Sequence, residues 1–129
     1  MERTRTILVA DDEPAFTVVV EMLLSLDGYE VVTVGDGREA LAWLREHTPD
    51  LAILDVAMPH LNGLDVCGRM KRVRRLKGVP VMILTGLRDD ATRTLARQAE
   101  ADALVPKPLE GKDFRALVRR LLAGERYPF

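Results

Sequence analysis

Short apolar runs alternate with longer segments of helical periodicity along this chain. The five runs are Ile7–Ala10, Tyr29–Val34, Leu51–Leu54, Val79–Leu84 and Ala103–Val105. Each run is as short as a typical strand. Their near-continuous hydrophobicity indicates strands that are buried on both faces of a sheet.

The segments between the runs predict helices. The first begins at Pro14, which a first helical turn accepts, and ends before Gly28, which suits the left-handed position after a helix. The others cover about residues 38–46, 64–75, 89–99 and 112–123. In the last of these, apolar residues recur at spacings of three and four and form an inward stripe. The stripe consists of Phe114, Leu117, Val118 and Leu121.

Strands that alternate with helices predict βαβ units around a parallel sheet. Right-handed crossovers leave few arrangements, and the leading one is a flavodoxin-like (βα)5 three-layer sandwich with strand order 2-1-3-4-5. No repeat or linker divides the 129 residues, so we expect a single domain over residues 1–129 with a short C-terminal tail, residues 124–129.

Composition narrows the class of protein. Apolar residues make up 47% and charged residues 30% of the chain, which is typical of a folded globule. The formal charge of -1 gives no reason to expect direct binding to nucleic acid or to a membrane. A single cysteine, Cys67, provides neither an internal disulfide nor a zinc framework. The apolar run after the charged N-terminus is too short for a signal peptide, so a cytoplasmic protein is expected.

Polar residues follow four of the five predicted strands. Asp11 and Asp12 follow the first, Asp55 the third, Thr85 the fourth and Lys107 the fifth. In open α/β sheets, ligands bind beyond the carboxyl ends of the strands. Three carboxylates that meet there would raise one another's pKa unless a cation neutralised them. Hard oxygen ligands without His or Cys favour magnesium, which commonly shares its shell with a phosphate.

Each of these residues has a chemical and a structural interpretation. Asp55 is the candidate nucleophile, because a carboxylate can form an aspartyl phosphate. Lys107 can pair with phosphoryl oxygens and Thr85 can donate a hydroxyl. Alternatively, Glu13 caps the following helix, Asp55 starts a turn, Thr85 ends a strand and Lys107 is a surface lysine. Their joint placement at one sheet edge favours the chemical interpretation.

Four segments together resemble the response-regulator receiver family. They are residues 9–14 (VADDEP), 54–59 (LDVAMP) with Asn62–Gly63, 83–86 (ILTG) and 105–108 (VPKP). The resemblance covers nearly the whole chain. It implies one receiver domain with five strands and five helices, phosphorylated on aspartate by a histidine kinase or a histidine phosphotransfer protein.

The resemblance also implies roles for single residues. Asp55 would accept the phosphoryl group, and Asp12 and Asp55 would bind Mg²⁺ directly. Asp11 would act largely through water, and the backbone carbonyl of Ala57 would be a further ligand.

Thr85 would turn toward the phosphoryl group and Lys107 would bind it, with a cis peptide bond between Lys107 and Pro108.

Four positions bear on how closely the chain follows the family pattern. Leu104 replaces the usual aromatic switch residue, so the readout must pass chiefly through Thr85 and its loop. Glu100 replaces a usual glycine. Ala57 and Leu87, which could steer a hydrolytic water, are apolar, so we expect slow autodephosphorylation.

Two surface features concern partners. In the first helix, Phe16, Val19, Val20 and Leu23 are expected to face the sheet. Val18 and Met22 would then lie outside and, with Pro108 and Leu109, could dock the phosphohistidine-bearing partner. The alternatives are a slightly apolar surface that binds no partner and a self-association face that gives a homodimer.

The second feature is a basic run, which we interpret as a solvated helix end rather than a nucleic-acid interface. It consists of Arg69, Lys71, Arg72, Arg74, Arg75 and Lys77.

Three rival functions share parts of this pattern. A magnesium-dependent aspartyl-phosphate phosphatase would need a second Asp where Ala57 stands, so no enzyme is expected. A flavodoxin-type electron carrier would need a hydroxyl- and glycine-rich loop where Asp11, Asp12 and Glu13 stand. A scaffold that is not phosphorylated would not need the full set of acids, threonine and lysine.

Overall fold

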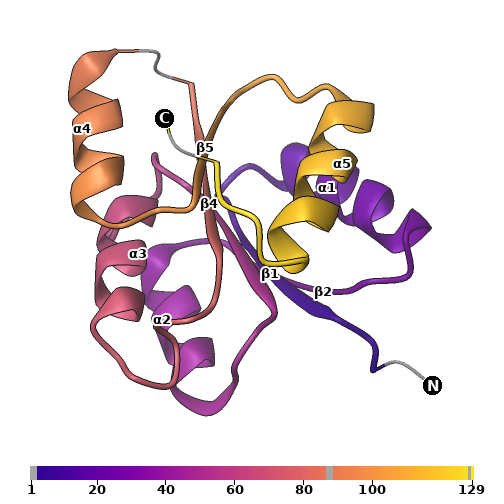
Figure 1. Ribbon diagram of the computed structural model, residues 1–129, viewed down its shortest axis with the longest axis horizontal. Helices are drawn as coiled ribbons and strands as arrows, with labels where there is room; N and C mark the ends of the chain where they lie inside the picture. Colours follow the sequence, from indigo (N-terminus) through magenta and orange to yellow (C-terminus); the bar gives the residue numbers. More distant parts are fainter. Residues whose placement is uncertain (1–2, 87–88, 128) are drawn as a thin grey trace.

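A parallel β-sheet runs through the centre of the computed structural model, which describes residues 3–86, 89–127 and 129. Figure 1 shows the strands between two groups of helices. The strands within these residues are β1 (Thr6–Ala10), β2 (Glu30–Val34), β3 (Leu51–Asp55), β4 (Val81–Thr85) and β5 (Ala103–Pro106). They pair in parallel in the order β2-β1-β3-β4-β5. The predicted flavodoxin-like order is confirmed.

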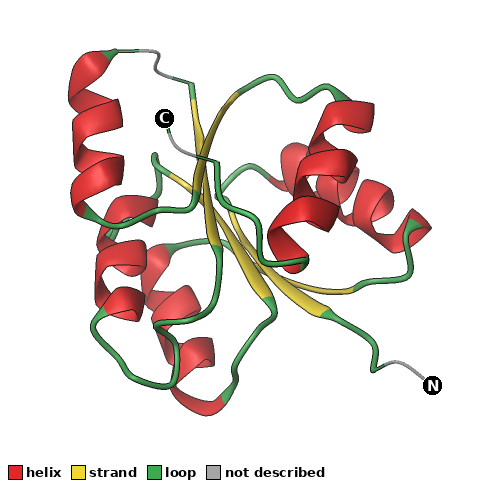
Figure 2. Cartoon of the chain, viewed as in Figure 1, coloured by secondary structure: helices red, strands yellow, loops and turns green. Residues whose placement is uncertain are grey.

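Helices cover both faces of this sheet. The described residues form α1 (Pro14–Leu26), α2 (Gly37–Glu46), α3 (Gly63–Lys71), α4 (Asp90–Gln98) and α5 (Gly111–Leu122). α1 and α5 lie on one face, and α2, α3 and α4 lie on the other (Figure 1, Figure 2). The predicted three-layer sandwich is therefore present. None of the helices in the described part of the chain has the length and hydropathy that a bilayer crossing requires.

Two hydrophobic clusters hold the layers together. Along β1, Leu8 and Ala10 belong to the cluster under α2 and α3, whereas Ile7 and Val9 belong to the cluster under α1 and α5. Successive side chains of a strand point to opposite faces, so one unbroken apolar run supplies both clusters. Each fully buried Leu or Ile contributes roughly 1.5–3 kcal/mol of transfer free energy.

The predicted inward face of α1 is partly wrong. Val20 is fully buried and Phe16 and Leu23 are half-buried, but Val19 is 53% exposed. Consecutive helical residues lie about 100° apart, so Val19 falls outside the buried stripe that passes through Phe16, Val20 and Leu24.

The basic run around the end of α3 is not simply a solvated helix end. α3 ends at Lys71, earlier than predicted, and the Lys71 side chain is only 8% exposed. Its Nζ donates to Asp102 Oδ2 at 2.8 Å and to the Val79 carbonyl at 3.0 Å. The same Asp102 oxygen accepts the Val81 N–H at 2.7 Å. This buried ion pair therefore ties α3 to the starts of β4 and β5.

Arg75, from the same run, is also structural. Its guanidinium donates to the backbone carbonyls of Leu44, Arg45 and His47 at the end of α2. The last carbonyls of a helix have no partner within the helix, so Arg75 satisfies acceptors that α2 leaves open. Arg75 is nevertheless exposed, as are four other members of the run: Arg69, Arg72, Arg74 and Lys77.

A residue in the loop between α4 and β5 has an unusual backbone conformation. Glu100, which stands where the receiver family usually carries glycine, has a φ of 63°. This left-handed region costs little for glycine and more for other residues, which gives a physical reason for the family's preference.

The C-terminal tail folds back across β5 toward α4 (Figure 1). The Tyr127 N–H donates to the Asp102 carbonyl at 3.0 Å, and Arg126 Nε lies 2.7 Å from the Asp102 carboxylate. Arg97 of α4 donates to the Phe129 carbonyl at 2.5 Å. The described tail residues are therefore attached to the sheet edge and to α4.

The end of α2 carries the single tryptophan of the chain. The Trp43 and His47 rings are stacked, with centroids 4.5 Å apart and an interplanar angle of 9°. Trp43 is half-buried against the cluster under α2 and α3.

Candidate functional site

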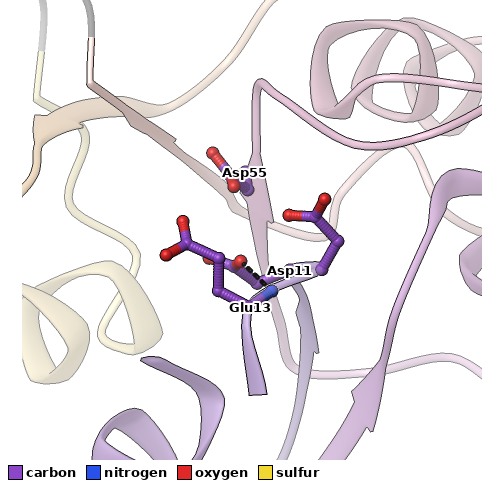
Figure 3. A group of neighbouring side chains, drawn as sticks. Asp11, Glu13 and Asp55 are labelled. Carbon is purple, nitrogen blue, oxygen red and sulfur yellow. Dashed lines mark hydrogen bonds between the residues drawn. The ribbon is translucent and has the colours of Figure 1, made fainter. Parts of the chain in front are cut away.

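Two buried carboxylates lie at the carboxyl ends of adjacent strands. Asp11 follows β1 and Asp55 ends β3, and these strands pair with Ala10 opposite Leu54. Both aspartates are 3% exposed. Figure 3 shows their side chains, together with that of Glu13, around one shared space. Like charges buried this close are unfavourable unless a cation lies nearby.

Four acidic residues at this edge could bind a metal ion. One carboxylate oxygen from each of Asp11, Asp12, Glu13 and Asp55 lies within 4.8 Å of the others. Asp12 and Glu13 are exposed, so the cluster opens to solvent on one side. Hard oxygen ligands with access to water suit Mg²⁺, which keeps part of its hydration shell. The residues present therefore fit the predicted metal.

Lys107 places a cation among these acids. Its Nζ lies 2.8 Å from Asp11 Oδ2, 3.2 Å from Asp55 Oδ2 and 3.4 Å from Glu13 Oε1. Its backbone N–H donates to the Thr85 carbonyl at 2.8 Å, which holds the start of the β5–α5 loop against β4. Lys107 therefore links the ends of β1, β3 and β4.

Burial and charge act together on the pKa values of Asp55 and Lys107. Burial, followed by the charge of Asp11, raises the pKa of Asp55, and Lys107 offsets part of this effect. Burial lowers the pKa of Lys107, but the hydrogen bonds to Asp11 and Asp55 and the charges of these two carboxylates together outweigh burial, and the net pKa is raised. Lys107 therefore stays protonated at neutral pH and favours the ionised form of Asp55.

Backbone contacts orient Asp55. The Ala57 N–H donates to Asp55 Oδ1 at 3.3 Å, while Oδ2 faces Lys107. Behind it, a Cβ atom at Gly63 would lie 2.3 Å from the Asp55 carbonyl oxygen. Only glycine allows α3 to begin this close to the end of β3. The predicted metal contact of the Ala57 carbonyl stays a prediction.

Thr85 lies at the same sheet edge. It ends β4 and is 2% exposed, and β4 pairs with β3 so that Leu84 lies opposite Asp55. The predicted cis peptide bond between Lys107 and Pro108 is present. The phosphoryl-binding role of Thr85 stays a prediction, and Leu87 lies outside the described residues.

The structure adds two residues to the surroundings of Lys107. Glu13 occupies the N-cap position of α1, but its side chain makes no cap hydrogen bond and approaches Lys107 instead. Phe16 lies with the centroid of its ring 4.2 Å from Lys107 Nζ. Side chains in a first helical turn lean toward the helix N-terminus, which is the signal that could have placed Phe16 near the site.

The exposed apolar pair on α1 is present as predicted. Val18 and Met22 are 57% and 64% exposed, and with Leu26, which is 70% exposed, they line a shallow hollow. Pro108 and Leu109 line a different hollow beside α5. The predicted docking patch therefore consists of two separate hollows.

Comparison with known proteins identifies close relatives. The DNA-binding response regulator MtrA of Mycolicibacterium smegmatis is 38% identical over 123 residues, which is 95% of this chain and 53% of MtrA. The chain spans about half the length of the curated relatives it matches.

Solved structures share the fold. The signal receiver domain of a signal transduction histidine kinase from Syntrophus aciditrophicus has a TM-score of 0.89 and 33% identity, covering 94% of this chain and 92% of its own. The receiver domain of sensor histidine kinase PA1611 from Pseudomonas aeruginosa, solved with magnesium in its active site cleft, has a TM-score of 0.86. Its identity is 24%, over 94% of this chain and 99% of its own, so it supports the fold alone.

The sequence model of the response regulator receiver domain matches residues 7–119. This match includes the acidic cluster, Thr85 and Lys107. The chain therefore belongs to the response regulator receiver domain family.

Proposed function

We propose that Asp55 of this receiver domain accepts a phosphoryl group from a phosphohistidine in a Mg²⁺-dependent reaction, and that the phosphorylated domain changes its partner binding. The observation that carries the proposal is the placement of Asp55. Its carboxylate ends a buried strand, between an acidic cluster and the ammonium of Lys107. An isolated structural aspartate would need neither neighbour.

In this proposal, Asp12 and Asp55 hold Mg²⁺ directly, Asp11 acts largely through water, and the Ala57 carbonyl is a further ligand. The close approach of the acidic oxygens supports this assignment. Bound Mg²⁺ would neutralise the carboxylates and stabilise charge on the phosphoryl oxygens.

The remaining steps belong to the side chains of the protein. An Asp55 carboxylate oxygen forms the new bond to phosphorus while the bond from phosphorus to the histidine nitrogen breaks. Lys107, already 3.2 Å from Asp55 Oδ2, pairs with the phosphoryl oxygens. Thr85 donates its hydroxyl to another of these oxygens. The new negative charge is thus met by a cation and a donor that the fold places at the same edge.

Two apolar residues bear on how phosphorylation of Asp55 is transmitted and on how long the aspartyl phosphate lasts. Leu104 is half-buried against the cluster under α2 and α3, so no aromatic side chain rotates at this position. We propose that the signal passes chiefly through Thr85 and the loop after it. The methyl group of Ala57 cannot orient a hydrolytic water, so we propose slow autodephosphorylation. A phosphoryl half-life of seconds in the isolated domain would overturn this point.

The partner is proposed to be a histidine kinase or a histidine phosphotransfer protein that docks on α1. The exposed side chains of Val18 and Met22 support this choice. Met22→Glu should slow transfer from the phosphohistidine partner while leaving phosphorylation by acetyl phosphate unchanged. If Met22→Glu instead dissociates a homodimer in sedimentation measurements without affecting transfer, the patch is a self-association face.

We propose no direct contact with nucleic acid by these residues. The name of MtrA describes DNA binding, but this chain covers only 53% of MtrA. Lys71 and Arg75, two of the six cations in the basic run, are engaged in structural contacts. The cytoplasmic location expected from the sequence also stays a prediction.

The proposal is tested by incubating the protein with acetyl phosphate and Mg²⁺ and measuring intact mass. We expect one phosphoryl adduct that requires Mg²⁺ and disappears in Asp55→Ala. Asp113→Asn, which removes an exposed carboxylate of α5, is the matched control and should keep the adduct.

Two other outcomes would each identify a rival function. The absence of an adduct with every donor would favour a scaffold that is not phosphorylated. Continuous release of phosphate from a phosphorylated substrate would favour a phosphatase.

A further inference from the structure

We propose that Phe16 is a positioning residue for Lys107. Its aromatic ring holds the lysine ammonium beside Asp55 through a cation–π contact. The inference rests on the proposed function, in which Lys107 binds the phosphoryl group on Asp55.

The ammonium of Lys107 is enclosed by two kinds of surface. Carboxylate oxygens of Asp11, Asp55 and Glu13 lie within 3.4 Å of Nζ, and the Phe16 ring centroid lies 4.2 Å away. The lysine side chain is only 16% exposed. A cation within about 6 Å of a ring centroid is attracted by the quadrupole of the ring, and more strongly where water is excluded.

The local fold of α1 places this ring. α1 starts at Pro14, so Phe16 lies in its first turn and leans back toward the loop that carries Asp11 and Glu13. Phe16 also packs against the cluster under α1 and α5, which anchors the ring from behind. The ring is therefore anchored by packing, whereas the lysine ammonium is joined to its backbone by a long chain of rotatable bonds.

A neutral ring suits this position better than a further carboxylate would. Phosphorylation replaces the single negative charge of the Asp55 carboxylate with about two on the phosphoryl group, and another nearby anion would repel them. The aromatic face attracts the cation without adding net charge. It also has no directional acceptor, so the ammonium can turn from Asp11 toward the phosphoryl oxygens while it stays on the ring. Once the ammonium has left Asp11, the ring holds a larger share of it, so a weaker ring disfavours the phosphorylated state more than the free state.

The test replaces Phe16 with ring-fluorinated phenylalanines. Fluorine withdraws electron density from the ring face and weakens cation–π attraction while the shape of the side chain changes little. The measured quantity is the dissociation constant for beryllofluoride, a phosphoryl mimic, in the presence of Mg²⁺. We expect it to rise stepwise from phenylalanine through monofluoro- and difluoro- to pentafluorophenylalanine, by about fivefold in total.

Two controls separate electrostatics from packing. The same fluorination at Phe114, a ring buried in α5 that contacts no cation among the described residues, should leave the constant unchanged. Phe16→Leu should weaken beryllofluoride binding and Phe16→Trp should preserve it. If fluorination at Phe16 has no effect while the Asp55 adduct still forms, the inference is overturned and the proposed function stands.

A second readout does not depend on phosphorylation. The pentafluorinated residue at position 16 should lower the equilibrium constant for folding about fivefold when Lys107 is present. It should not lower this constant in Lys107→Met, where no cation faces the ring. If the wild type forms no Asp55 adduct, the proposed function fails and this comparison alone decides the inference. Equal effects in both backgrounds would overturn it.

Discussion

Lys71→Met should lower the free energy of unfolding far more than the position of Lys71 in a basic run of the sequence implies. The lysine and Asp102 side chains are 8% and 11% exposed and form a 2.8 Å ion pair. Removal of one partner from a buried pair costs roughly 3–5 kcal/mol, because the other charge remains buried without it. Asp102 keeps the Val81 N–H and Arg126, so we expect the lower end, about 3 kcal/mol.

Urea denaturation measures this cost. With a denaturant slope of about 1.5 kcal/mol/M, the midpoint should fall by about 2 M. Lys77→Met is the matched control, because Lys77 is exposed and forms no ion pair within the described residues. It should change stability by less than about 0.5 kcal/mol.

A double variant tests the cause. Lys71→Met combined with Asp102→Asn removes the charge that has lost its buried partner. The amide oxygen of the asparagine can still accept the Val81 N–H, and only the ion pair with the exposed Arg126 is lost in addition. We expect it to regain at least half of the lost stability. The reasoning is refuted if Lys71→Met and Lys77→Met unfold at the same urea concentration.

Three further predictions concern the glycines of α3, the ion pair of α1 and the cysteine. Gly63→Ala should destabilise by about 2 kcal/mol or more, because its Cβ would meet the Asp55 backbone, and should impair phosphorylation. A Cβ atom added at Gly68, in the middle of α3, would meet no atom within 4 Å, so Gly68→Ala should stabilise the protein by about 0.5–1 kcal/mol. Calorimetry that gives the two variants the same stability would contradict both expectations.

The hydrogen bond from Arg115 lowers the pKa of Asp27 below its ordinary value of 3.8. The stabilisation that this ion pair gives the folded protein is therefore present at neutral pH, and it is lost as the pH falls below 3.8 and through the lowered pKa. Asp27→Asn should therefore be less stable than wild type at pH 7, with a gap that closes in acid. A gap that widens in acid denaturation curves would show the sign to be wrong. Burial raises the pKa of Cys67 to about 12, so iodoacetamide should label it only after unfolding, and rapid labelling of the native protein would contradict this.

The sheet and its carboxyl edge were predictable because their signals are local. Apolar runs marked each strand, and Asp11, Asp55, Thr85 and Lys107 are the first polar residues beyond those runs. Parallel pairing then brings them to one edge whatever the details of packing. Strand and helix ends differ from prediction by a few residues, because ladders and caps depend on neighbours distant in sequence.

The errors have a common physical origin. Lys71 and Arg75 have the sequence context of surface cations. Their partners, Asp102 and the end of α2, lie 28 to 31 positions away in the sequence. Likewise, Phe16 belongs to the apolar stripe of α1, and only the folded position of Lys107 gives its ring a second contact. A long side chain can reach several environments, and pattern alone does not select among them.

The stack of Trp43 on His47 determines what intrinsic fluorescence can report. Because this is the only tryptophan, its emission senses the far end of α2 and the ring of His47, rather than the acidic cluster. An optical titration with Mg²⁺ or a phosphoryl mimic should therefore use an introduced fluorophore near the β4–α4 loop. The natural tryptophan is better suited to following unfolding.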